Sequence, residues 1–201
     1  ESRHARFQQD GYICARTFYF MDEIAELNHE IARFVRDIVP GMPAEQIYYE
    51  DKTDKTSLKQ IQRMFDYDPY FRDLMDQGPA RRLAEEVLQD EVVPVNMQYF
   101  NKPAGIGQPT PAHQDGYYFH LTPCEAVTGW LALEDVDEEK GCIHYIRGSH
   151  LETSFRPRRD RVRSLDGWRG AGRSDRRRRA ERPRSSPHRG QLGRGWLRAA
   201  E

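Results

Sequence analysis

Apolar residues recur at helical spacing in three segments of the N-terminal half. In residues 21–41, "MDEIAELNHEIARFVRDIVPG", apolar side chains return every three or four positions, which predicts an amphipathic helix. Asp22 is the expected N-cap, and the closing Pro-Gly pair is a stop signal. Residues 69–78 and 79–91 each open with a proline, and they predict two further helices.

After residue 91 the pattern changes to short β-branched and aromatic runs that are separated by turn-rich stretches. Four such runs predict strands, at residues 92–100, 113–121, 128–136 and 142–148. A further strand is expected near residues 58–64. Helices followed by several short strands predict an α+β protein that is built on a β-sandwich or barrel.

From about residue 152 this patterning ends. Residues 1–150 hold 15 Lys and Arg against 26 Asp and Glu, whereas residues 151–201 hold 16 Arg, no Lys and 6 acidic residues. Such asymmetry indicates two segments of different nature. We therefore expect a folded domain over residues 1–151 and a low-order tail rich in Arg, Gly, Ser and Pro over residues 152–201. A reading frame that shifts near residue 152 of a GC-rich gene would leave the same composition.

Composition also limits the class of protein. No run of eighteen apolar residues is present, so no membrane-spanning segment is expected, and the first residues lack the apolar core of a secretory leader. The three cysteines show no Cys-x-x-Cys spacing, which is typical of reduced thiols in a cytoplasmic protein.

His113 and Asp115 stand one residue apart in "PTPAHQDGYYFHL", residues 109–121. If this segment is extended, both side chains face one point from positions about 7 Å apart along the backbone. Imidazole and carboxylate groups on one face of an iron ion form the facial triad of non-haem Fe(II) oxygenases. Such a pair arises readily by chance, so it indicates a metal site only with its context, a Gly/Pro loop before it and aromatic residues after it.

The larger pattern resembles the phytanoyl-CoA dioxygenase family of Fe(II)- and 2-oxoglutarate-dependent oxygenases over residues 7 to about 151. The motifs are "FQQDGYICARTFYFMDEIAELNHEI", "NKP", "AHQDGYYF" and "TGWLALEDVDEEKGCIHYIRGSH". The resemblance implies a double-stranded β-helix, or jelly roll, here incomplete, with N-terminal helices packed outside it. Arg147 stands where the family usually has the proline of "PGSH", and we expect this to change the rigidity of the turn more than the chemistry.

The resemblance also implies the residues of the site. His113 and Asp115 match the first two iron ligands. Trp130 matches an aromatic residue beside the 2-oxoglutarate pocket, Gln98 a position that contacts this cosubstrate, and Lys59 a lysine that reaches it. Judged without the resemblance, Trp130 reads as a core residue, Lys59 as a surface lysine and Gln98 equally as a solvent-facing strand residue.

Two further residues that the family pattern needs are not evident. One is a third iron ligand, a late histidine, and the other is an arginine about ten residues beyond it that pairs with the far carboxylate of 2-oxoglutarate. His188 and Arg198 have this spacing, but Gly190, Gly193 and Gly195 would weaken a strand around them. We therefore leave both roles unassigned.

These expectations describe an enzyme with Fe(2+) and 2-oxoglutarate as cofactors, and with dioxygen and a small molecule as the substrates. It would hydroxylate an unactivated C–H bond; neither the substrate nor the oligomeric state is indicated. Two alternatives stay open. One is a catalytically inactive remnant of the family. The other is a nucleic-acid-binding protein that acts through its Arg-rich tail, although the acidity of residues 1–150 argues against a broad nucleic-acid surface.

Overall fold

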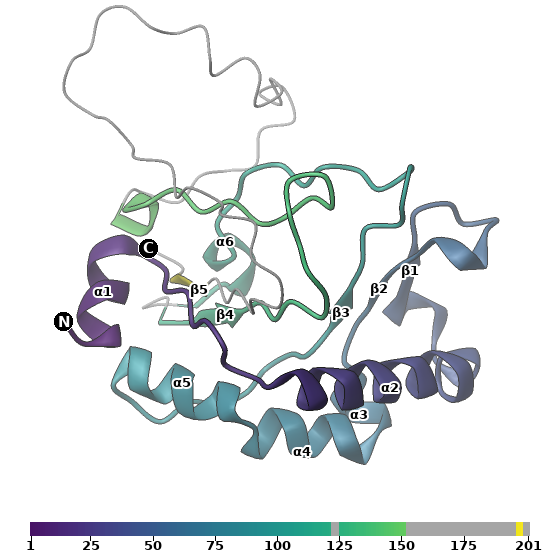
Figure 1. Cartoon of the computed structure of the whole chain (residues 1–201), viewed down its shortest axis with the longest axis horizontal. Helices are drawn as coiled ribbons and strands as arrows, with labels where there is room; N and C mark the ends of the chain where they lie inside the picture. Colours follow the sequence, from purple (N-terminus) through teal and green to yellow (C-terminus); the bar gives the residue numbers. More distant parts are fainter. Residues whose placement is uncertain (122–124, 152–195, 199–201) are drawn as a thin grey trace, which may run out of the picture.

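The computed structural model describes residues 1–121 and 125–151 together with the strand at residues 196–198. Its first half is mainly helical, and Figure 1 shows α2, α4 and α5 along one side of the molecule with the strands on the other. The α-helices are α1 (Arg3–Asp10), α2 (Met21–Asp37), α3 (Met64–Tyr67), α4 (Pro69–Gln77), α5 (Pro79–Leu88) and α6 (Gly116–Phe119). Short 3-10 helices are η1 (Val39–Gly41), η2 (Ala44–Gln46), η3 (Lys55–Ser57) and η4 (Ser149–Leu151).

Two small antiparallel sheets accompany these helices. In the first, β1 (Ile47–Tyr49), β2 (Leu58–Ile61) and β3 (Tyr99–Phe100) lie in the order β1-β2-β3. In the second, β4 (Val127–Gly129) pairs with β5 (Trp196–Arg198), so that Thr128 lies opposite Leu197. In Figure 1, α6 lies beside β4, and β3 separates this region from β2.

The core consists of apolar side chains that join the helices to each other and to the sheets. Phe7 of α1 and Val87 of α5 are fully buried in one cluster. Phe34 of α2 and Phe71 of α4 pack in a second cluster with their ring centroids 5.3 Å apart in an edge-to-face arrangement, and Ile61 of β2 is buried with them. Full burial of such side chains contributes about 1.5–3 kcal/mol each, so these contacts hold the helical layer against the first sheet.

The three long helices confirm the sequence periodicity, but the N-cap of α2 differs from the prediction. The helix begins one residue before Asp22, and Phe20 is its N-cap. The carboxylate of Glu23 accepts a hydrogen bond of 2.7 Å from the backbone N–H of Phe20. Asp22 instead lies in the first turn, where its negative charge still favours the positive end of the helix dipole.

The strand predicted near residues 58–64 is confirmed by β2, whereas the four strands predicted after residue 91 are largely wrong in extent. Residues 92–100 and 128–136 contribute only the short strands β3 and β4, and residues 142–148 form no strand. Residues 113–121 contain the short helix α6 in place of a strand. Two i to i+3 hydrogen bonds, from the N–H of Tyr117 to Gln114 O and from that of Tyr118 to Asp115 O, close this turn. Local turn closure therefore overrides the β propensity of the aromatic run.

The predicted tail falls almost entirely outside the described residues. Its exception is β5, which forms where the composition predicts a low-order segment, and its backbone pairs with β4. Within the described part of the chain, no helix combines the length and the apolar character that crossing a membrane requires.

Candidate metal centre

His113 and Asp115 converge, although not by the geometry that the sequence predicts. The His113 Nε2 atom lies 3.3 Å from Asp115 Oδ1. His113 belongs to the irregular segment before α6, and Asp115 has the α-helical backbone conformation of the residue that begins it. A turn, and not the alternation of a strand, therefore brings the imidazole and the carboxylate together.

The other ring nitrogen of His113 has a fixed partner. Nδ1 lies 2.7 Å from the carbonyl oxygen of Pro111. Because a carbonyl can only accept, Nδ1 carries the proton, and in the neutral ring the lone pair belongs to Nε2. Histidines that bind metals usually have this arrangement, in which the N–H that faces away from the metal donates to a carbonyl or carboxylate.

Asp115 is oriented in the same way by a neighbour on β4. Thr128 Oγ1 donates a hydrogen bond of 2.6 Å to Asp115 Oδ2, which leaves Oδ1 facing His113. Sequence reasoning did not single out Thr128. The sequence places it two residues before Trp130, and nothing in the sequence shows that its hydroxyl reaches Asp115.

Each member of the pair shifts the pKa of the other. The hydrogen bond with Asp115 raises the pKa of His113, and partial burial opposes this shift. The hydrogen bond with His113 lowers the pKa of Asp115 against the effect of burial, and the bond from Thr128 lowers it further. Without a metal, the pair is therefore stabilised as imidazolium and carboxylate. A divalent cation that binds there must displace the proton on Nε2.

The chemistry of this donor set fits part of an iron site. An imidazole nitrogen and a carboxylate oxygen face one another, and each ligand has an outer hydrogen-bond partner that fixes its orientation. In residues 1–121 and 125–151, no group of three or more His, Cys, Asp or Glu side chains could hold a metal ion. His188, the weak sequence candidate for a third ligand, lies outside the described residues.

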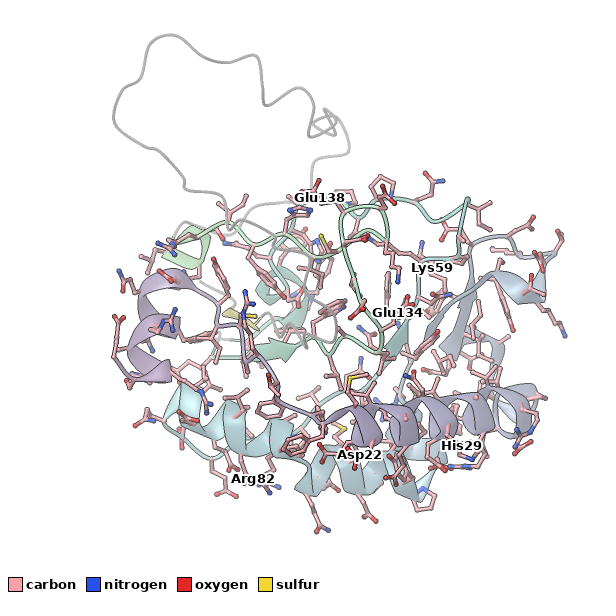
Figure 2. All side chains as sticks on the ribbon, viewed as in Figure 1. Asp22, His29, Lys59, Arg82, Glu134 and Glu138 are labelled. Atoms are coloured by element: carbon pink, nitrogen blue, oxygen red, sulfur yellow. The ribbon has the colours of Figure 1, made fainter. Side chains whose placement is uncertain are left out.

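Lys59 and Gln98 contact other partners. Lys59 Nζ forms an ion pair with Glu50 Oε2 at 2.8 Å, and Figure 2 shows Lys59 on the side of the molecule that carries β2, away from α6. Gln98 precedes β3, and its side-chain oxygen accepts a hydrogen bond of 2.8 Å from Gln60. The structure thus brings neither residue into contact with the pair, and a role at the cosubstrate stays a prediction for both.

Trp130 follows β4 directly and is half-buried. It packs against the cluster formed by Tyr19, Ile24 and Ala132, which is the core role that its residue type alone suggests. Its place on the chain, two residues after Thr128, keeps it near the end of the strand that contacts Asp115. The predicted role beside 2-oxoglutarate remains a prediction.

Three more polar residues in the recognised motifs make contacts that sequence reasoning missed. Asn101 and Lys102 of "NKP" donate to the carbonyls of Leu58 at 3.0 Å and Gly141 at 2.7 Å, so this motif joins β2 to the loop before residue 142. Gln114, between the two candidate ligand residues, is buried with 4% exposure. A polar residue between two candidate ligands was the available signal for Gln114.

A family model described as phytanoyl-CoA dioxygenase (PhyH) matches residues 7–186 of this chain. The chain belongs to the phytanoyl-CoA dioxygenase family. The match confirms the resemblance and continues beyond residue 151, where the motifs that carry the resemblance end. It stops before His188.

Relatives with this domain occur in several animals. The mouse phytanoyl-CoA dioxygenase domain-containing protein 1 is 27% identical over 189 residues, which cover 74% of this chain and 65% of the relative. The Caenorhabditis elegans homologue is 23% identical over 185 residues, covering 74% of this chain and 64% of the relative. This PhyH-family chain thus spans slightly less than two thirds of the length of these relatives.

Solved structures support the fold expectation. EctD from S. alaskensis, determined with bound Fe, superposes with a TM-score of 0.66 at 19% identity, covering 97% of this chain and 69% of EctD. The epimerase SnoN, in complex with Fe3+, alpha ketoglutarate and nogalamycin RO, gives a TM-score of 0.57 at 18% identity, covering 96% and 81%. The PhyH-family chain therefore shares their jelly-roll fold, of which the described residues form two small sheets and the surrounding helices.

Proposed function

We propose that this protein is an Fe(II)- and 2-oxoglutarate-dependent dioxygenase that hydroxylates a small molecule, with His113 and Asp115 as two of its iron ligands. The observation that carries the proposal is the convergence of His113 Nε2 and Asp115 Oδ1, each oriented by an outer hydrogen bond. Family membership supports the reaction class. The solved relatives whose names include iron and 2-oxoglutarate support the same cofactors.

The residues of the chain have separate tasks in this reaction. When bound, Fe(II) and 2-oxoglutarate supply the activation of dioxygen, which couples decarboxylation of 2-oxoglutarate to succinate with hydroxylation of a C–H bond. Pro111 holds the His113 ring through Nδ1, so that Nε2 offers its lone pair after losing its proton to solvent. Thr128 holds the Asp115 carboxylate so that Oδ1 faces the same point. Lys59, Gln98 and Trp130 are proposed to act on the cosubstrate.

Substitution of Asp115 tests this proposal. Asp115→Ala should lower Fe(II)-dependent succinate formation by more than about 100-fold, since loss of even an outer-shell partner of a metal costs about 10–100-fold. The measurement is succinate produced from 2-oxoglutarate under oxygen, with iron affinity titrated in parallel. Asp73→Ala is the matched control, because Asp73 is an exposed acidic residue on α4. Full succinate production by Asp115→Ala would reject the assignment.

The second candidate function is that of an inactive remnant with residual metal affinity. It is favoured by one observation, that the described residues supply two converging ligands and no third. Anaerobic titration with Fe(II) and then 2-oxoglutarate separates the two candidates. A metal-to-ligand charge-transfer absorption that needs both additions supports the dioxygenase, whereas Fe(II) binding without that absorption supports the remnant.

A further inference from the structure

Two segments that are far apart in the sequence pack against each other near the candidate ligands His113 and Asp115. They are residues 8–12, from the "FQQDGY" motif, and residues 145–150, from "YIRGSH". The backbone N–H of Gly148 donates to the carbonyl of Asp10 at 2.9 Å. The rings of Tyr12 and Tyr145 stack with centroids 5.2 Å apart and an interplanar angle of 17°. These contacts fix the turn that ends in η4 against the end of α1.

Steric fit and a side-chain hydrogen bond tighten the same interface. His150 is buried with 4% exposure, and its Nε2 lies 2.9 Å from the carbonyl oxygen of Gln8. Gly11 has a φ of +80°, and a Cβ atom added to it would meet His150 Nδ1 at 2.3 Å. The imidazole therefore occupies the space that a side chain at residue 11 would need, and only glycine allows this approach.

The turn also supports the residue between the two ligands. Gln114 Nε2 donates a hydrogen bond of 2.8 Å to the carbonyl oxygen of Ser149. Because Gln114 is buried and directly joins His113 to Asp115 in the chain, its side chain anchors the backbone that presents both ligands. The position of the Ser149 carbonyl depends in turn on the contacts of its neighbours Gly148 and His150 with residues 8–12.

Arg147 adds the one direct charge contact across this interface that is recorded in the described residues. Its Nε atom lies 3.4 Å from Asp10 Oδ1. That oxygen is buried and receives no well-aligned hydrogen bond, so the pair is electrostatic, and the Asp10 side chain is only 14% exposed. The Arg147 side chain is 58% exposed, so solvent screens the pair on one side. Loss of the guanidinium would still leave a mostly buried carboxylate without this counter-charge.

We propose that Arg147 is a positioning residue for the candidate metal ligands His113 and Asp115. Through its ion pair with Asp10 it holds the turn at residues 147–150, and the turn holds Gln114 and hence His113 and Asp115. A proline at this position, as in "PGSH", would stiffen the turn but could make no such ion pair. The inference rests on the proposed function for its effect on iron, while its effect on the backbone at residues 111–119 is independent of iron.

The test compares Arg147→Gln with Arg147→Lys, which keeps the charge, and with Arg36→Gln, which removes an exposed arginine paired with Asp37. In the metal-free protein, Arg147→Gln should accelerate amide hydrogen exchange in residues 111–119 severalfold more than in α2. It should raise the Fe(II) dissociation constant about threefold to tenfold, somewhat less than loss of a direct outer-shell partner. Arg147→Lys should largely restore both quantities, and Arg36→Gln should change neither.

A double variant distinguishes positioning from general stability. In a Gln114→Ala background the link to the turn is already broken, so Arg147→Gln should add no further loss of Fe(II) affinity. The positioning role is overturned if exchange in residues 111–119 keeps its wild-type rate in Arg147→Gln, or if it rises only as much as in α2. The proposed function fails separately, if Fe(II) affinity does not respond to Asp115→Ala.

Discussion

At the scale of single residues, the candidate site consists of His113 and Asp115, which contact each other, and each has a second hydrogen-bond partner. Sequence reasoning could propose His113 and Asp115 as ligands because ligand types and their spacing are written in the chain, and the structure brings the two side chains together. It could not identify Thr128 or Gln114, since their roles depend on which backbone and side-chain atoms the fold brings within hydrogen-bond distance. It also gave the wrong local geometry, because the convergence results from the turn at Asp115.

The shifted pKa values make the stability of the metal-free protein depend on pH. The raised pKa of His113 stabilises the fold fully below the ordinary histidine value of 6.5, and this contribution is lost as pH rises through the raised pKa. The lowered pKa of Asp115 stabilises the fold above the ordinary value of 3.8, and this contribution is lost as pH falls through the lowered pKa. The ion pair is therefore most effective between these two ordinary values.

We expect His113→Ala to lower the thermal unfolding midpoint more at about pH 5 than at about pH 9, where the imidazole is neutral. The measurement is thermal unfolding with a metal chelator present at both pH values. Part of the loss should persist at the higher pH, because the bond to the Pro111 carbonyl does not need the charge. A deficit that is equal at both pH values would contradict the ion pair.

At the scale of elements, the prediction of secondary structure succeeded where one face of a segment is buried. It failed where hydrogen bonds within a turn determine the conformation. The helices α2, α4 and α5 show the three-to-four-residue spacing of buried side chains such as Phe34, Phe71 and Val87. Residues 113–121 carry three adjacent aromatic residues, all of them partly exposed, so no alternation between faces constrains them. His120 then ends α6 with a positive φ of 53°, a feature that residue type does not predict.

Substitutions at three glycines can separate two costs of adding a side chain, steric overlap and backbone strain. Gly11 has a positive φ and meets His150, Gly105 has a φ of +77° in open space, and Gly41 has open space and no positive φ. We expect Gly105→Ala to cost about 1–2 kcal/mol of unfolding free energy from backbone strain. Gly11→Ala should cost more, because the imidazole must also move, and Gly41→Ala should change the stability by less than about 0.5 kcal/mol.

Chemical denaturation of the three variants measures these differences, each relative to wild type. Hydrogen exchange at residues 145–150 should rise in Gly11→Ala alone. If Gly11→Ala and Gly105→Ala lose equal stability, then the close approach of His150 to Gly11 adds no steric cost. The packing of residues 145–150 against the end of α1 would then be looser than its geometry indicates.

At the scale of the whole molecule, the motifs of residues 7–151 were sufficient to predict the family, and the family model bears this out. Composition predicts a boundary near residue 152, the family match runs to residue 186, and the boundary stays a prediction. Apolar periodicity is the signal that sequence reasoning uses for strands, and the Arg-rich segment lacks it. For this reason neither a third ligand nor an arginine for 2-oxoglutarate could be assigned from the pattern.

The contact between Gln8 and His150 joins positions 142 apart in the chain. During synthesis from the N-terminus, His113 and Asp115 leave the ribosome before the turn that supports Gln114. The end of α1 cannot form its contacts with this turn until residues 145–150 have been made. Such a distant closure is slow compared with formation of local helices. In refolding experiments with pulsed hydrogen exchange, residues 111–119 should gain protection together with residues 145–150 and after α2. If His113 and Asp115 bind iron as proposed, a nascent chain would hold iron only weakly, and tight binding would require the last stage of folding.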